Sequence, residues 1–189
     1  MDTEERFNAL YRAYYRAVLL YASRRTDPDT ARDVVAETFL IAWRRLDSVP
    51  ADSGQAEPWL YGVARRVLAN AERSQRRMHR LAARMVHDSG DEALADPALV
   101  ISERQRLIQA LRRLPEPERE ALRLVGWDGL DLAGAALAMG CSRSAMAVRL
   151  HRARRRLESE LRETDTSAAD TSDQRFGAPT QRVVQHESR

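Results

Sequence analysis

Arginine is the residue type in this sequence with the clearest chemical potential, because it is abundant and gathers in two places. All 31 basic residues are Arg and none is Lys. Seven of them lie between Arg65 and Arg84 beside a single acid, Glu72, and six lie between Arg143 and Arg156 with no acid. A guanidinium group carries a permanent charge and a planar fork of donors that fits phosphate. A GC-rich genome would also favour Arg over Lys, but a merely solvated helix face would mix both signs, so the clustering favours a nucleic-acid surface.

Residue types that carry catalysis or bind metals do not gather in this sequence. Its histidines are His79, His87, His151 and His186, and its one cysteine is Cys141, which excludes a disulfide framework and offers no metal-ligand spacing. No carboxylate pair with a histidine or a nucleophile can be assembled, nor a glycine loop that cradles phosphate. We therefore expect no enzyme activity, no cofactor and no metal site.

Composition indicates an all-α protein. With 43% hydrophobic residues the chain can bury a core, while 31% charged residues, 6% aromatic residues and 8 glycines favour helices with solvated faces over a β-sandwich. No apolar run approaches the roughly 18 residues of a membrane span, and the start MDTEERFNAL lacks the basic and apolar segments of a signal peptide. We expect a cytoplasmic protein.

The first part of the chain predicts three helices. Apolar residues recur at helical spacing over residues 7–21, with Asp2 and Glu5 placed as a capping pair. A second helix begins at the Asp27-Pro28 pair and runs to about residue 46. A third opens at Pro58 and covers about 27 residues, or roughly 40 Å.

The polar face of the second helix carries one large apolar residue. Leu40 lies between Glu37 and Arg44, on the face that also holds Asp33. An exposed apolar side chain ringed by charges is typical of a protein-binding hot spot, although a single exposed Leu is also ordinary on any surface.

Trp59 lies at the edge of the basic face of the third helix. A flat ring beside a row of cations suits stacking on an unpaired base. The alternative is that Trp59 simply packs the start of the helix.

Near its C-terminal end the sequence contains the parts of a helix-turn-helix. A helix of small residues, DLAGAALAMG, ends at Gly140, and a longer helix follows with Ser142 as its N-cap. Ala135 and Ala136 permit a close helix crossing, and Met146 can fill the space between the two helices. We expect the second helix to enter the major groove. Its residues nearest base edges would be Arg143, Ser144, Ala147 and Val148, and those nearest phosphates Arg149, Arg152 and Arg154.

The two basic segments are separated by an acidic one. Asp88 to Val100 holds four acids and no base, and its helical periodicity fades. The expected organisation is two small helical domains, at residues 1–86 and 102–162, joined by a flexible linker at 87–101. Residues 163–189 are polar and lack periodicity, which predicts a disordered tail.

Three segments in this order resemble a known family. They are RDVVAETFLIAWRR, then PWLYGVARRVLANAERSQRR, and after the acidic segment LPEPEREALRLVGWDGLDLAGAALAMGCSRSAMAVRLHRARRRL. The pattern resembles the bacterial sigma-70 family of RNA polymerase sigma factors, in the small extracytoplasmic-function (ECF) group, over about residues 7–161. The resemblance implies a sigma region 2-like helical bundle followed by a sigma region 4-like helix-turn-helix.

The resemblance also implies a function, partners and sites. Such a protein binds core RNA polymerase through its β′ and β subunits and directs promoter-specific transcription initiation. It reads the minus-35 element as duplex through the helix-turn-helix and melts the minus-10 element through region 2, and an anti-sigma factor is a further implied partner. The residues implied for polymerase docking are Asp33, Glu37, Leu40 and Arg44. Those implied for the minus-10 element and strand opening are Trp59, Arg65, Arg66, Arg73, Arg76 and Arg77.

A stand-alone helix-turn-helix regulator is the alternative function. Such a regulator needs only duplex binding, so it gives no reason for a second basic helix with an aromatic edge or for the exposed face around Leu40.

Overall fold

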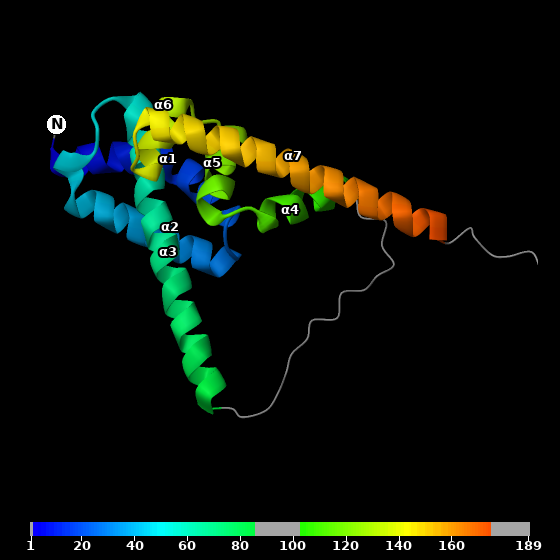
Figure 1. Cartoon of the computed structure of the whole chain (residues 1–189). Helices are drawn as coiled ribbons and strands as arrows, with labels where there is room; N and C mark the ends of the chain where they lie inside the picture. The colour runs from blue at the N-terminus through cyan, green and yellow to red at the C-terminus, as the bar shows by residue number, and fades with distance from the viewer. Residues whose placement is uncertain (1, 86–102, 175–189) are drawn as a thin grey trace, which may run out of the picture.

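The computed structural model describes residues 2–85 and 103–174, and every regular element in these ranges is helical, which confirms the all-α expectation. None of the described helices is both long enough and apolar enough to cross a membrane. The acidic segment lies outside the described residues. In chain order the elements are α1 (Thr3–Ser23), α2 (Pro28–Arg44), a 3₁₀ turn (Leu46–Ser48), α3 (Ser53–Met85), α4 (Glu103–Arg113), α5 (Glu116–Gly126), α6 (Leu132–Met139) and α7 (Arg143–Gln174) (Figure 1).

The helices α1 to α3 form an N-terminal unit whose starts follow the sequence signals. In α1 the Glu5 carboxylate accepts a hydrogen bond from the Asp2 amide at 3.2 Å, as the predicted capping pair requires. Asp27 caps α2 by accepting from the amides of Asp29 and Thr30, at 3.1 and 3.0 Å, ahead of Pro28. The hydrogen bonds from Thr30 lower the pKa of Asp27 to about 2.

The start of α3 differs from the prediction that Pro58 opens the helix. The helix begins at Ser53, and Asp52 holds this start because its carboxylate accepts from the Gly54 amide at 3.0 Å. Pro58 lies inside the helix, where it removes one backbone hydrogen bond. The prediction is wrong because the sequence alone does not distinguish a proline in an early turn of a helix from a proline at its first position. The packing of the buried Pro58 against α6 offsets the lost backbone hydrogen bond.

The helices α4 to α7 form a C-terminal unit that contains the predicted helix-turn-helix. Asp131 caps α6 by accepting from the Gly134 amide at 2.7 Å, and Gly140 closes α6 with φ of +64°, a left-handed conformation that glycine adopts without strain. Ser142 caps α7 through the Ala145 amide at 3.1 Å. Met146 is fully buried where α6 meets α7.

The helix α7 extends beyond the segment predicted to be ordered. It continues to Gln174, so the prediction that a disordered tail begins at residue 163 is wrong as to its start; residues 175–189 lie outside the described part of the chain. A helix that is already formed adds residues without a new nucleation step, and therefore polar residues of moderate propensity can extend it.

The two units pack against each other through α6 and the first half of α3 (Figure 1). Buried apolar side chains from both units form one continuous cluster, which includes Leu60 and Ala64 of α3 with Ala135 and Ala138 of α6. Among the described residues of α3 after Leu68, none is buried, and this half of the helix projects away from the rest of the molecule (Figure 1).

Replacing Met146 by Ala is expected to lower the free energy of unfolding by about 2 to 5 kcal/mol, because the change leaves a cavity between α6 and α7. Chemical denaturation followed by circular dichroism measures this loss. The matched control is Val148→Ala, two residues along the same helix, where the side chain is exposed and the change should be nearly neutral. Equal losses in the two variants would contradict the assignment of Met146 to the core.

Candidate nucleic-acid interface

The first turns of α7 present a polar and basic face to solvent. The helix buries Met146, Leu150 and Ala153 against the rest of the C-terminal unit, and the opposite side is therefore exposed. The exposed side chains on it that the sequence singled out are Arg143, Ser144, Ala147, Val148, Arg152 and Arg154.

Arg149 differs from its neighbours on α7. Its side chain is half-buried, and its guanidinium lies 3.5 Å from the Cys141 sulfur in the turn before the helix. It nevertheless lines a surface groove together with Ser144, Val148 and Arg152, between α7 and the start of α5. Arg149 therefore lies at the edge of the exposed face of α7 and also contacts the turn that precedes this helix.

Helix α3 carries a second group of exposed cations, most of them on its projecting half. Arg66, Arg73, Arg76 and Arg77 are all exposed. Within this group Arg76 forms an ion pair with Glu72 of the preceding turn at 3.2 Å, a surface contact of little energetic weight. Four guanidinium groups in three turns of helix make this a strongly cationic surface.

The two remaining residues of the predicted strand-binding set are less exposed than these four cations. Trp59 is half-buried and packs against the central apolar cluster. Arg65 is half-buried and donates hydrogen bonds to the carbonyl oxygens of Ala138 and Met139, at 3.4 and 3.3 Å. These carbonyls belong to the last turn of α6, where a cation is favourable because the helix dipole is negative there. Arg65 thus binds the C-terminal unit rather than facing solvent.

A third surface lies on α2. Asp33, Glu37, Leu40 and Arg44 are exposed, and Leu40 is 41% exposed in spite of its apolar side chain. Leu40, Asp33 and Glu37 line a shallow groove between α2 and α3. This surface combines an apolar centre with charged surroundings and is separate from both arginine-rich faces.

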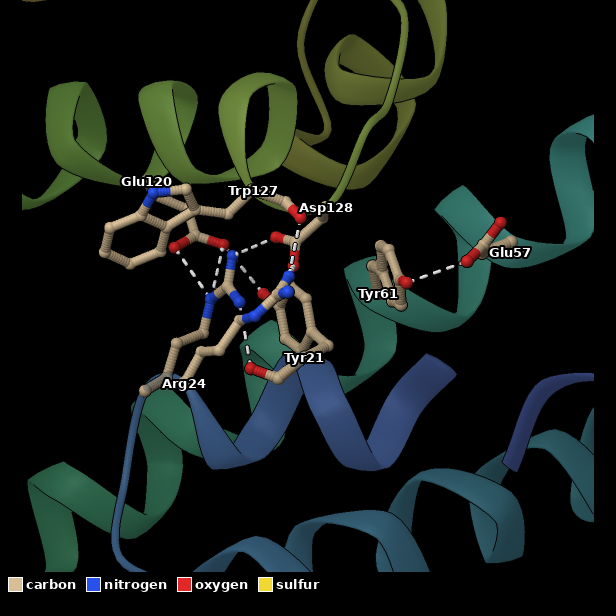
Figure 2. A network of polar contacts seen from close by, with 8 residues as sticks. Tyr21, Arg24, Glu57, Tyr61, Glu120, Trp127 and Asp128 are labelled. Atoms are coloured by element: carbon tan, nitrogen blue, oxygen red, sulfur yellow. Dashed lines mark hydrogen bonds and ion pairs between the residues drawn. The ribbon is translucent and has the colours of Figure 1, made fainter. Parts of the chain in front are cut away.

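The contact between the two units contains a buried group of charges that we call the Arg25 cluster: Arg25, Glu120, Asp128 and Tyr21, of which the last three are labelled in Figure 2. The Arg25 guanidinium donates to both oxygens of Glu120, at 3.1 and 3.0 Å, and to Asp128 at 2.6 Å. It also donates to the Tyr21 carbonyl at 2.9 Å and lies 3.5 Å from the centroid of the Tyr21 ring. All three guanidinium nitrogens therefore have acceptors.

The Arg25 cluster is almost completely shielded from water. Only 5% of the Arg25 side chain is exposed, and 4% and 1% of Glu120 and Asp128. Arg24, which is more exposed, donates to Asp128 at 3.1 Å and to the Trp127 carbonyl at 2.6 Å (Figure 2). The two arginines come from the end of α1 and the two carboxylates from α5 and the loop that follows it, so the charges balance across the contact.

Tyr21 joins this group of charges to the apolar core. Its hydroxyl donates to Glu120 at 2.8 Å, and its ring stacks on that of Tyr61 of α3 at 4.6 Å between centroids (Figure 2). Burial and then the charge of Glu120 raise the pKa of Tyr21 far above the usual value for a phenol. The hydroxyl therefore stays protonated and acts as a donor.

The residues of the Arg25 cluster are not among the site residues predicted from the sequence. One local signal was present, because Glu120 falls on the same helical stripe as the buried Ala121 and Leu124 of α5. A carboxylate among core positions requires a buried partner. Nothing in the sequence indicates that this partner is Arg25, which lies 95 residues earlier.

Among the described residues, no group of side chains is arranged to hold a metal ion.

Tyr21→Phe is expected to lower the free energy of unfolding by about 1 to 3 kcal/mol, because it leaves a buried carboxylate oxygen of Glu120 without this donor. Denaturant titration of the full chain measures the loss. Tyr15→Phe, at an exposed position of the same helix, is the control and should have little effect. Indistinguishable midpoints for the two variants would show that the hydroxyl contributes nothing.

Comparisons with known proteins agree with this division into two units. The family description "Sigma-70 region 2" matches residues 10–78, and "Sigma-70, region 4" matches residues 104–157. The ECF RNA polymerase sigma factor SigL of Mycobacterium tuberculosis is 28% identical over 156 residues, which cover 82% of this chain and 88% of SigL. The ECF RNA polymerase sigma-E factor of Escherichia coli is 30% identical over 168 residues, which cover 84% of this chain and 87% of that protein.

A solved structure gives the same result at the level of the fold. The sigma factor RpoE from Bartonella quintana, crystallised with the anti-sigma factor NepR, superposes with a TM-score of 0.60 and 27% identity. The superposition covers 82% of this chain and 96% of that one. With both regions matched in order and relatives aligned over most of their length, the chain belongs to the ECF group of the sigma-70 family and is a sigma factor for transcription initiation.

Proposed function

We propose that this sigma factor binds core RNA polymerase and directs it to promoters by reading the minus-35 element as duplex and opening the minus-10 element. The observation that carries the proposal is the exposed Leu40 within the charged face of α2. A regulator that binds only DNA has no use for an apolar protein-binding surface separate from its cationic faces. The chain supplies recognition, and catalysis stays with the polymerase.

The α2 face is the proposed polymerase-docking surface. Leu40 supplies apolar contact area at its centre, and Asp33, Glu37 and Arg44 supply surrounding charges that favour one orientation of the partner. We propose the β′ subunit as the partner of this face and the β subunit as a further contact of the bound chain.

The start of α7 is the proposed minus-35 reader. Its first residues are exposed and able to enter a major groove, where Arg143 can donate two hydrogen bonds to a guanine and Val148 can contact a thymine methyl group. Ser144 and Ala147 complete the base-facing positions. Arg149, Arg152 and Arg154 fit phosphate contacts, which hold the helix in register.

The basic face of α3 is the proposed binding surface for the opened minus-10 strand. Arg66, Arg73, Arg76 and Arg77 follow one another along an exposed helix and can track a phosphate backbone. Trp59 adds an aromatic ring for base stacking, and Arg65 completes this surface only where the C-terminal unit does not engage it.

The proposed limits of the functional parts follow the sequence expectation. Region 2 occupies residues 1–86, the linker 87–101 and region 4 residues 102–162. The sigma factor RpoE of Bartonella quintana, which has a similar fold, was solved with the anti-sigma factor NepR. We propose an anti-sigma factor as a partner of this chain as well.

Transcription in vitro with purified core polymerase on a promoter library tests the proposal. Run-off products from a defined subset of promoters, absent with core enzyme alone, are the supporting result. Binding to duplex DNA without any stimulation of the polymerase would instead support a stand-alone regulator.

Leu40→Asp is expected to abolish co-purification of the chain with core polymerase, because it places a charge at the centre of the docking surface. Circular dichroism should show an unchanged fold, since Leu40 is exposed. Leu20→Asp is the matched control, because Leu20 is an equally exposed leucine of α1, at 49%, outside the α2 face. Retained co-purification of the Leu40 variant would refute the assignment.

Arg143→Ala is expected to cost about 1 to 3 kcal/mol in binding to the preferred duplex and to relax the preference at one base pair. Competition binding with single-base variants of the minus-35 element measures both effects. A loss that is equal for every duplex sequence would make Arg143 a phosphate contact instead.

A further inference from the structure

We infer that a groove between the end of α1, the middle of α3 and α5 is a binding site for a small ligand with two linked phosphate groups, as in pyrophosphate or a nucleoside diphosphate. The groove has a volume of about 370 Å³. Small-molecule sites in proteins span roughly 300 to 1,000 Å³. The inference goes beyond promoter recognition, because its ligand is neither polymerase nor DNA.

The lining of this groove is strongly cationic. Six arginines and three glutamates line it, an excess of three positive charges. The glutamates are Glu72, Glu116 and Glu120. Two linked phosphate groups carry a similar charge of opposite sign. The arginines come from the segment after α1, from α3 and from α5, and they are Arg25, Arg65, Arg73, Arg76, Arg119 and Arg123.

Only two of these arginines form ion pairs. Arg25 pairs with Glu120 and Asp128, and Arg76 pairs with Glu72. Within the described part of the chain, the contacts of the other four are with neutral groups: backbone carbonyls, an asparagine side chain and a tryptophan ring. These four are Arg65, Arg73, Arg119 and Arg123.

The two arginines of α5 are the least compensated of the set. Arg119 and Arg123 are half-buried, and the Nε atom of each is buried with no hydrogen-bond partner among the described residues. The Arg123 guanidinium lies 5.5 Å from the centroid of the Trp127 ring, which attracts the charge but accepts no conventional hydrogen bond. A shielded cation without an acceptor is unfavourable, so an anion in the groove would compensate it.

The electrostatics of Arg123 agree with this interpretation. Burial lowers the pKa of Arg123, and the positive charges of Arg25 and Arg119 lower it further, against the opposing effect of Glu120. An arginine keeps its proton at neutral pH in spite of such a change. The lowered pKa therefore reflects a cation held among other cations, and a bound anion would reverse its sign.

The geometry of the groove favours two phosphate groups over one. Helices α3 and α5 border the groove and are not closely packed on each other. Arg73 lines it from α3, and Arg119 and Arg123 line it from α5. A guanidinium offers a planar pair of donors that fits phosphate. Linked phosphates can contact arginines of both helices at once, whereas a single phosphate has fewer oxygens to share between them.

The α5 arginines also separate this groove from the proposed path of the opened DNA strand. That path follows the exposed face of α3, and two of its arginines, Arg66 and Arg77, do not line the groove. A strand on α3 has no need of half-buried cations from α5. A compact ligand within a limited groove does, because it must be held from more than one side.

Isothermal titration calorimetry of the full chain tests the ligand class. Inorganic pyrophosphate is expected to bind at least about tenfold more tightly than inorganic phosphate or sulfate at the same ionic strength, because it can form one or more additional charge-assisted hydrogen bonds. ADP should bind about as tightly as pyrophosphate if the linked phosphates are the recognised group. Equal affinities for pyrophosphate, phosphate and sulfate would indicate general charge screening and would overturn the inference.

Arg123→Gln tests the site. It is expected to weaken pyrophosphate binding about tenfold, and Arg123→Lys is expected to lose less because it keeps the charge. Arg66→Gln is the matched control, since it removes an exposed cation of α3 that lies outside the groove. It should leave pyrophosphate binding unchanged. The same loss in Arg66→Gln as in Arg123→Gln would contradict the location of the site.

Melting temperatures separate a binding role of Arg123 from a structural one. Without ligand, Arg123→Gln is expected to melt no lower than the wild type, because the repulsion from Arg25 and Arg119 is removed. Pyrophosphate should raise the melting temperature of the wild type and have a much smaller effect on the variant. A lower melting temperature of the variant together with wild-type affinity for pyrophosphate would make Arg123 a structural residue and overturn its assignment.

Binding of a fluorescein-labelled single-stranded DNA distinguishes the groove from the strand-binding face. Arg123→Gln should bind the strand as the wild type does, and Arg66→Gln should bind it more weakly. If Arg123→Gln weakened strand and pyrophosphate binding to the same extent, the groove would belong to the DNA path and the inference would fail. The pyrophosphate measurements use no polymerase, so a failure of the proposed function, seen as the absence of any promoter-dependent transcript, is a separate result.

Discussion

The arrangement of the two units depends on one buried cation, the Arg25 guanidinium. A charge removed from water must find compensation for all of its donors, and Arg25 finds it only because two carboxylates of the other unit and a carbonyl of its own helix surround it. The net gain over full hydration is small, because both partners lose their water as well. The ion pairs provide selectivity, because another packing of the units that buried these charges would leave them without these partners.

The composition of α6 follows from its position between two helices. The helix packs against α7, and Ala135, Ala136 and Met146 of this pair of helices are all buried. It also lies on α3, where Gly134 and Ala138 permit the backbones to approach. A helix of eight residues that must come close to neighbours on two sides has little room for large side chains, and LAGAALAM is the result. Leu137, which is exposed, is one of the few bulky exceptions.

Local features of the fold were predictable from local signals. The Asp27-Pro28 start of α2, the glycine turn at Gly140 and the exposure of Leu40 all follow from spacing and cap chemistry within a few residues. The start of α3 was not predictable in this way. The cap at Asp52 and the tertiary packing of Pro58 outweigh the usual preference of proline for the first position of a helix.

The candidate site shows the same division. The exposed arginines on α3 and α7 follow from helical periodicity, whereas the engagement of Arg65 by α6 does not. That contact joins residues 73 and 74 positions apart, and the Arg25 pairs join residues 95 and 103 apart. Periodicity marks Glu120 as a buried carboxylate that needs a partner, but it leaves no signal of which distant residue that partner is.

The projecting half of α3 has an energetic consequence of its own. Every residue of α3 from Glu72 to Met78 is exposed, and turns of helix with so little packing are only marginally stable in water, even with an internal pair such as Glu72 and Arg76. Fraying from the free end should therefore be in rapid equilibrium with the helical form. A polyanion that neutralises Arg73, Arg76 and Arg77 together would suppress that fraying, so the conformational entropy lost by the helix would offset part of the favourable entropy of counterion release.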